Sequence, residues 1–250
     1  MIRLILALCF FNILISWGGA QVNIEQYRTQ AVSTQKTHFN TLNANLSYHS
    51  GNINALRFGI NLKSLIQVTP FSILLIAQLD QAKSNHIDYI NKQFYHVRGV
   101  YPVRQPMDIE VFIQSENNVF LQVTQRALIG TGLRFNTSTP LNDLTLYVGA
   151  GAMSESIRYT NQSTLNKSRL NLYISSQYDH RQIAINWVTY YQPNLQLFSD
   201  YQILSDFRVK AQITSLLSSI TDIHYRYDAT PINGLNPTDI EIKNGLGIDF

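Results

Sequence analysis

Basic side chains of this chain recur at every second position, opposite apolar residues. Arg126 and Arg134 share one side of a segment whose other side carries Ile129 and Leu133. Since neighbouring residues of a β-strand point to opposite faces, this spacing gathers the charges on one face. A ring of arginines or lysines inside a pore favours anions. The alternative interpretation is that these cations pair with carboxylates such as Glu110 and fill a narrow interior.

The same alternation selects the residues predicted to face a lumen. They are Arg57, Lys63, Arg98, Glu110, Arg126, Arg134, Arg169, Arg208, Arg226, Glu241 and Lys243.

Hydrolytic chemistry would need a serine nucleophile beside a histidine base, and a polar group that orients the base. His96 and His224 are expected on the interior face, and the other four histidines lie near strand ends or turns. Ser50 follows His49 directly, but adjacent strand residues point to opposite faces. The sequence therefore predicts no catalytic residues.

Metal and nucleotide sites are not indicated either. No cluster of His, Asp and Glu has the spacing of metal ligands, so we predict no metal and no cofactor. Gly130, Gly132, Gly149 and Gly151 precede no helix, as a nucleotide-binding fingerprint would require. We expect these glycines to relieve crowding inside the protein, where two neighbouring strands omit side chains.

Twelve segments of alternating residues, separated by turn-type residues, could position these side chains. In one of them Ile109, Val111 and Ile113 face away from the acidic residues. The segment from Leu121 to Phe135 is predicted as one regular strand, with Leu121 on the apolar outer face. The polar stretch Ser154 to Lys167 is predicted as a loop. The pattern predicts an all-β fold: a transmembrane antiparallel up-and-down β-barrel of about 12 strands.

The C-terminal segment Asp239 to Phe250 alternates in the same way and ends on an aromatic residue. Such a final strand is typical of a bacterial outer-membrane barrel, and we assign its apolar side as a barrel-insertion signal: Ile242, Leu246, Ile248 and Phe250. An even number of strands then places both chain ends on the periplasmic side. Further aromatic residues are predicted to form girdles at the membrane interfaces: Tyr48, Tyr101, Tyr191, Tyr225 and Tyr227.

Composition supports a membrane location and excludes some functions. Only 14% of residues are charged, with 14 Tyr and 12 Phe, whereas about a quarter are charged in soluble proteins. Residues 1–20 have the basic start, apolar stretch and small-residue end of a cleaved signal peptide. Removing them takes away Arg3 and the only cysteine, Cys9, and leaves 18 basic against 16 acidic residues. So small an excess argues against a nucleic-acid binder.

Several segments resemble the salt-induced outer-membrane proteins, a bacterial family of uncharacterised function. The matching segments are residues 45–48 with 50–52, 110–114, 126–135, 191–193, 225–228 with Pro231, and 239–250. The resemblance spans most of residues 39–250 and implies an outer-membrane barrel. It supplies no catalytic residues, and a single proline, Pro231, stands where the family commonly has a pair.

The sequence thus predicts three parts: a signal peptide at 1–20, a periplasmic lead-in at 21–38, and an outer-membrane β-barrel at 39–250. The predicted function is a barrel of the cell outer membrane without catalytic activity, structural or a narrow pore with an arginine-rich lumen. The alternatives are an outer-membrane phospholipase-type hydrolase or an adhesin acting through surface loops. The expected partners are outer-membrane lipid and, during biogenesis, periplasmic chaperones and the barrel assembly machinery.

Overall fold

The computed structural model describes residues 38–49, 55–84, 87–119, 121–138, 143–214, 217–232 and 235–248. The predicted signal peptide, nearly all of the lead-in, and Phe250 lie outside these residues. No helix within these ranges is long and apolar enough to cross a membrane.

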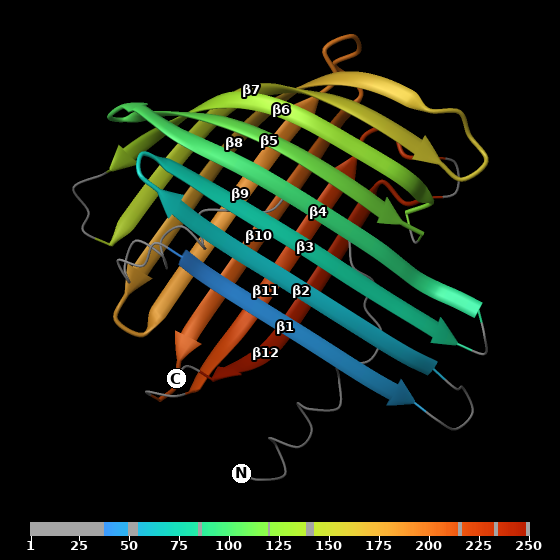
Figure 1. Ribbon diagram of the computed structural model, residues 1–250, viewed down its shortest axis with the longest axis horizontal. Coiled ribbons are helices and arrows are strands. Elements are labelled where there is room, and N and C mark those ends of the chain that lie inside the picture. Colours follow the sequence, from blue (N-terminus) through green and yellow to red (C-terminus); the bar gives the residue numbers. More distant parts are fainter. Residues whose placement is uncertain are drawn as a thin grey trace.

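Twelve β-strands make up the described chain (Figure 1). They are β1 (His38–His49), β2 (Ala55–Val68), β3 (Phe71–Ser84), β4 (Ile87–Arg104), β5 (Met107–Asn118), β6 (Val123–Ser138), β7 (Leu144–Tyr159), β8 (Leu165–His180), β9 (Ile183–Pro193), β10 (Tyr201–Gln212), β11 (Leu217–Asp228) and β12 (Thr238–Ile248).

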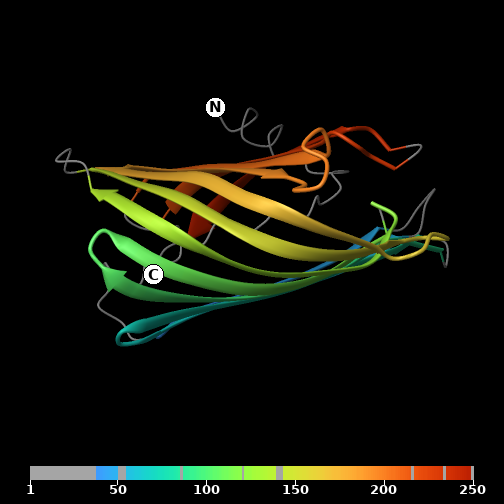
Figure 2. The same cartoon turned by 90° about the horizontal axis from the view of Figure 1, so that it is seen from above.

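All twelve strands belong to one sheet, in which each strand is hydrogen-bonded antiparallel to its sequence neighbour. The sheet curls, so that β1 to β5 form the front wall in Figure 1 and β8 to β12 the back wall, with β6 and β7 joining them at the top. Figure 2, seen from above, shows the two walls as separate layers. The predicted antiparallel up-and-down fold of about 12 strands is confirmed.

The two ends of the curled sheet differ in their connections. At one end, called here the turn end, residues 69–70, 105–106 and 181–182 join strands by tight turns. The opposite end, called the loop end, carries longer connections that include residues 194–200 and 229–237.

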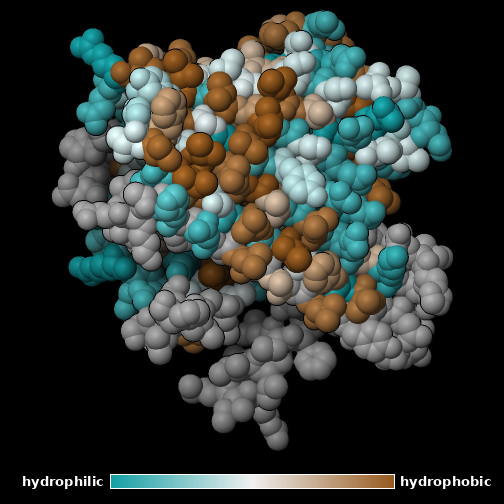
Figure 3. Space-filling model, viewed as in Figure 1, coloured by the Kyte–Doolittle hydropathy of each residue, from teal (hydrophilic) through white to brown (hydrophobic). Residues whose placement is uncertain are grey.

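The strands have an apolar outer face and a polar inner face. In β5, Val111 and Ile113 are exposed, whereas Glu110, Gln114 and Glu116 are buried, which confirms the predicted alternation of this strand. Other strands also expose large aliphatic residues on the outside: Ile129, Leu133, Val148, Leu172, Ile174, Ile240 and Ile242. Figure 3 shows apolar side chains gathered across the wall that faces the viewer.

Two details of the predicted strands are wrong. The stretch Ser154 to Lys167 is mostly strand, because β7 runs to Tyr159 and β8 starts at Leu165. Leu121 and Val123 are buried rather than outward, since the pairing of β5 and β6 shifts near Asn118 and that of β6 and β7 shifts between Val123 and Gln125. A β-bulge of this kind reverses the faces of the residues before it.

Apolar residues also enter the interior. One cluster joins Leu65, Leu74, Ile76, Phe94 and Val100 of β2 to β4. A second joins Phe112, Leu128 and Met153 of β5 to β7. The described interior is therefore packed in part, rather than lined by polar groups alone.

Candidate functional site

The central network of the interior consists of Arg98 on β4, Asp108 and Glu110 on β5, and Arg134 on β6. Arg134 donates from Nε and Nη2 to Asp108 Oδ2, at 3.2 and 2.5 Å. Glu110 lies between the two arginines, with Oε2 3.2 Å from Arg98 Nη1 and Oε1 3.4 Å from Arg134 Nη1. Both arginine side chains are 0% exposed. These four groups balance their charges, and only Asp108, with 12% of its side chain exposed, keeps appreciable contact with solvent.

Tyr173 on β8 joins the central network across a group of glycines on the inner faces of β6 and β7. Its hydroxyl donates to Glu110 Oε2 at 2.8 Å, although β8 and β5 are separated by two strands. A Cβ atom on Gly149 would lie 2.0 Å from the Tyr173 ring, and one on Gly151 would lie 2.7 Å from the Cα atom of Gly132. The prediction that the glycines relieve interior crowding is therefore confirmed.

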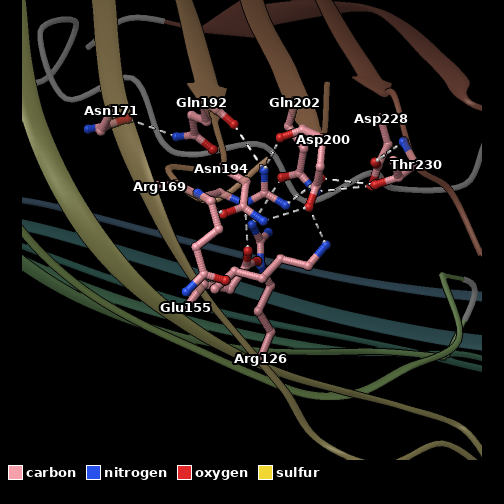
Figure 4. A network of polar contacts seen from close by, with 12 residues as sticks. Arg126, Glu155, Arg169, Asn171, Gln192, Asn194, Asp200, Gln202, Asp228 and Thr230 are labelled. Carbon is pink, nitrogen blue, oxygen red and sulfur yellow. Dashed lines mark hydrogen bonds and ion pairs between the residues drawn. The ribbon is translucent and has the colours of Figure 1, made fainter. Parts of the chain in front are cut away.

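The mouth network lies at the loop end and consists of Arg126, Glu155, Arg169 and Asp200. Glu155 on β7 accepts from Arg126 Nε at 2.6 Å and from Arg169 Nε at 2.7 Å. Arg126 on β6 also donates to Gln202 Oε1 on β10 at 3.2 Å. Figure 4 shows these side chains converging between the strands. The network thus bridges strands that are four apart in the sheet.

Asp200 belongs to the connection between β9 and β10, residues 194–200, called here the β9–β10 loop. Its carboxylate accepts from Arg169 Nη2 at 3.0 Å and from Thr230 Oγ1 at 2.9 Å, and Lys167 Nζ lies at 2.8 Å. Burial alone would raise the pKa of this carboxyl. Hydrogen bonds from Lys167, Asn194 and Arg169, with the charge of Arg169, instead hold the Asp200 pKa well below its usual range. The loop is therefore fastened to the sheet by an ionised carboxylate.

The inner face of β10 and β11 is more hydrated than the two networks. Arg208 pairs with Asp222, and His224 Nδ1 lies 2.6 Å from Asp206 Oδ1. All four side chains are partly exposed. Because these groups face solvent in part, water reaches this section of the inner wall.

The remaining predicted lumen residues take varied positions. Arg57 makes two hydrogen bonds with the Asp80 carboxylate, at 3.1 and 2.7 Å. Arg226 lies 3.7 Å from Asp228, Lys63 is half-buried, and Glu241 is buried. The side chain of Lys243 lies outside the described residues, as do those of Leu246 and Ile248 in the predicted insertion signal. Ile242 of that signal is exposed on the outer face.

The histidines inside the sheet have polar partners. His96 lies 3.1 Å from Gln114 Oε1 and accepts from Arg98 Nε at 3.4 Å. Its ring stacks between those of Phe94 and Phe112. Over the described ranges, no group of three or more His, Cys, Asp or Glu residues is arranged to hold a metal ion.

Sequence reasoning did not single out Glu155, Asp200, Gln202 or Tyr173. Glu155 sits inside the stretch that was predicted as a loop, and Asp200 follows β9 in a true loop. Glu155 lies an even number of residues after Gly149 and Gly151, so it shares their inner face, but this follows only once β7 is extended to Tyr159. For Tyr173, the signal is its position opposite Gly149 in the pairing of β7 and β8.

Comparisons with known proteins add family and fold information. The sequence matches the family described as "Protein of unknown function, DUF481" over residues 42–250. No curated protein matches the chain. A NanC porin structure shares 10% identity with it at a TM-score of 0.49, covering 84% of this chain and 99% of the porin. The CymD monoaromatic hydrocarbon channel also shares 10% identity, at a TM-score of 0.41, covering 93% of this chain and 86% of the channel.

The family match agrees with the predicted membership in a group of unknown function, while the salt-induced designation stays a prediction. Because the match spans nearly all of the described sheet, the chain belongs to the family of proteins of unknown function DUF481.

Proposed function

We propose that the protein is a β-barrel of the outer membrane, without catalytic activity, whose interior is closed by its own side chains. The sheet would close through its two edge strands, β1 and β12, because an open sheet edge leaves backbone groups unpaired in lipid. The outer face supports this location, since exposed aliphatic residues surround an interior that holds buried arginines and carboxylates. Outer-membrane lipid and, during biogenesis, the assembly machinery are the partners in this proposal.

The observation that carries the proposal is the bridge across the interior. Arg126 contacts Gln202, and Arg169 contacts both Glu155 and Asp200, so the mouth network ties β6 to β8 to β10 and to the β9–β10 loop. In an open channel the arginines would face water. Here Arg126 and Arg169 are 4% and 1% exposed.

A narrow pore is the second candidate, and the hydrated inner face of β10 and β11 favours it. Arg208, Asp222, His224 and Asp206 would line such a path from the turn end. The path would still meet the mouth network, so conduction would require the β9–β10 loop to move. We therefore regard the closed barrel as the resting form.

Cysteine labelling tests closure directly. The only cysteine in the sequence, Cys9, lies in the predicted signal peptide, so a reporter can be placed without background. Ser175, on the inner face of β8, is 0% exposed, whereas Ser163 is exposed in the connection between β7 and β8. In detergent micelles, where both ends are accessible, a charged thiol reagent should modify Ser175→Cys at least about tenfold more slowly than Ser163→Cys.

Equal rates for the two variants would mean that the interior is open to solutes, and the closed-barrel proposal would fail. Phospholipid hydrolysis by the same preparation, abolished by a serine-directed inhibitor, would overturn the absence of catalysis.

A further inference from the structure

The β9–β10 loop exposes three large apolar side chains. Leu195, Leu197 and Phe198 are 43%, 55% and 59% exposed. The sequence has no charged residue from 182 to 199. Exposed apolar groups gathered on a loop mark a contact with a partner or with a membrane.

The loop is held in one conformation by its polar residues. Asn194 donates from its backbone N to Asp200 O at 2.8 Å and from Nδ2 to Asp200 Oδ2 at 3.1 Å. Asp200 N donates to Leu197 O at 2.8 Å, and Gln196 N donates to Asn194 Oδ1 at 3.0 Å. Both Asn194 and Asp200 are buried. Because these residues fix the base of the loop, the apolar side chains of Leu195, Leu197 and Phe198 stay exposed at its surface.

The loop lies directly beyond the apolar outer face of the back wall. Leu195 N donates to Ser168 O of β8 at 2.8 Å, which continues the edge of β9 along that strand. Tyr191 precedes the loop, and its ring centroid lies 5.6 Å from that of Tyr201, which in turn lies 5.7 Å from that of Tyr227. The loop is the orange segment that projects at the top of Figure 1. A row of three tyrosines in ring contact, Tyr191, Tyr201 and Tyr227, thus lies between the outer apolar face and the loop.

We propose that Leu195, Leu197 and Phe198 insert into the lipid at the outer boundary of the membrane. This inference rests on the proposed function, which places the outer face of the sheet in lipid. The apolar surface continues from that face through the tyrosine row to the loop, and aromatic residues of this kind mark the boundary between lipid and water. Residues 195–199 of the loop carry no charged side chain, so this part of the loop has no charge to desolvate at that boundary.

The inserted loop would be held from two sides. Its inner base is fastened by Asp200 to Arg169 and Lys167, and its outer apex is fastened by lipid.

Tryptophan fluorescence tests the insertion. Without the predicted signal peptide the chain has one tryptophan, Trp187. Trp187→Phe therefore removes the tryptophan emission of the protein itself, so that any emission comes from an introduced tryptophan. Three reporters are then compared in vesicles made with or without brominated phosphatidylcholine: Phe198→Trp on the loop, Val111→Trp on the outer face, and Gln162→Trp on the exposed β7–β8 loop. Brominated lipid should reduce the emission of Phe198→Trp and Val111→Trp by about twofold or more, and leave Gln162→Trp nearly unchanged.

The possible failures can be told apart. If Val111→Trp is quenched and Phe198→Trp is not, the lipid contact of the loop is wrong while the membrane location stands. If Val111→Trp is not quenched either, the proposed function itself fails. Emission from Phe198→Trp that shifts with protein concentration, but not with brominated lipid, would indicate contact with a second copy and would overturn the lipid contact.

Discussion

Buried charge governs stability at the scale of single residues. Glu155 is 1% exposed and pairs with two arginines, Arg126 and Arg169, which are themselves buried. Removing ions from water is costly, and the cost is offset only while every member keeps its partners. The partly exposed pair of Arg208 and Asp222 bears much less of this cost, because water still solvates it.

Glu155→Gln should therefore be far more damaging than a matched change in the partly exposed pair of Arg208 and Asp222. We expect it to lower the free energy of unfolding by about 3–5 kcal/mol, because two buried guanidinium groups lose a charged partner. The control Asp222→Asn should cost no more than about 1 kcal/mol. Reversible denaturant unfolding in lipid vesicles measures both values. Similar losses for the two variants would show that the mouth network is not shielded from water.

The close approach of Gly149 to the Tyr173 ring gives a second prediction at the scale of single residues. In Gly149→Ala the new methyl group would overlap the Tyr173 ring, so Tyr173 must move and its hydrogen bond to Glu110 is lost. Overpacking of this kind should cost about 1–3 kcal/mol. Gly245→Ala is the control, since a Cβ atom there has nothing within 4 Å, and its effect should stay within about 0.5 kcal/mol. A tolerated Gly149→Ala with the Tyr173 contact intact would contradict the account.

At the scale of the element, each strand separates two environments. Along β5, Glu110 and Gln114 are buried inside while Val111 and Ser115 are exposed outside. On the outer face the aliphatic residues of β5 are followed by Ser115 toward the loop end. The proposed membrane location therefore predicts a cost for charge that depends on the position along one strand.

Val111→Arg should destabilise the protein in lipid vesicles by about 2–4 kcal/mol, because its charge would lie within the hydrocarbon. Ser115→Arg, four residues farther along the same face, should cost no more than about 1 kcal/mol. Unfolding free energies of the two variants in the same vesicles give the comparison. If both positions tolerate arginine equally, the outer face of β5 is not in lipid.

The Asp200 carboxylate in the β9–β10 loop gives a prediction about how the protein responds to low pH. Folding lowers the pKa of Asp200, so its carboxylate stabilises the closed loop above the ordinary aspartate value of about 3.9. That stabilisation is lost progressively as the pH falls from this value to the still lower pKa of the folded state. Ion conductance should accordingly be the same at about pH 4.5 as at neutral pH. An opening transition between about pH 6 and pH 5 would show that a group other than Asp200 holds the loop.

At the scale of the whole molecule, local alternation predicted the architecture but not the interior contacts. The outward residues of β5 could be read from the sequence because the two faces of this strand have opposite polarity. Toward the loop end the outer face no longer carries aliphatic residues, so the difference in polarity between the two faces disappears. The part of β7 around Glu155 therefore resembles a loop in the sequence. The bulge near Val123 could not be predicted, because it shifts the pairing of β6 and β7 without leaving a mark in the sequence of residue types. The contact of Arg126 with Gln202 depends on how far the sheet curls, which no local pattern encodes.

The central claim is that the mouth network closes the barrel, and planar-bilayer conductance tests it most directly. The refolded protein should give no sustained channel steps. Asp200→Ala should give discrete steps, because Arg169, Lys167 and Thr230 then lose the carboxylate that fastens the β9–β10 loop. The control Asp222→Asn, outside the mouth network, should stay closed. Stable steps from the unmodified protein, as large as those of Asp200→Ala, would contradict the account.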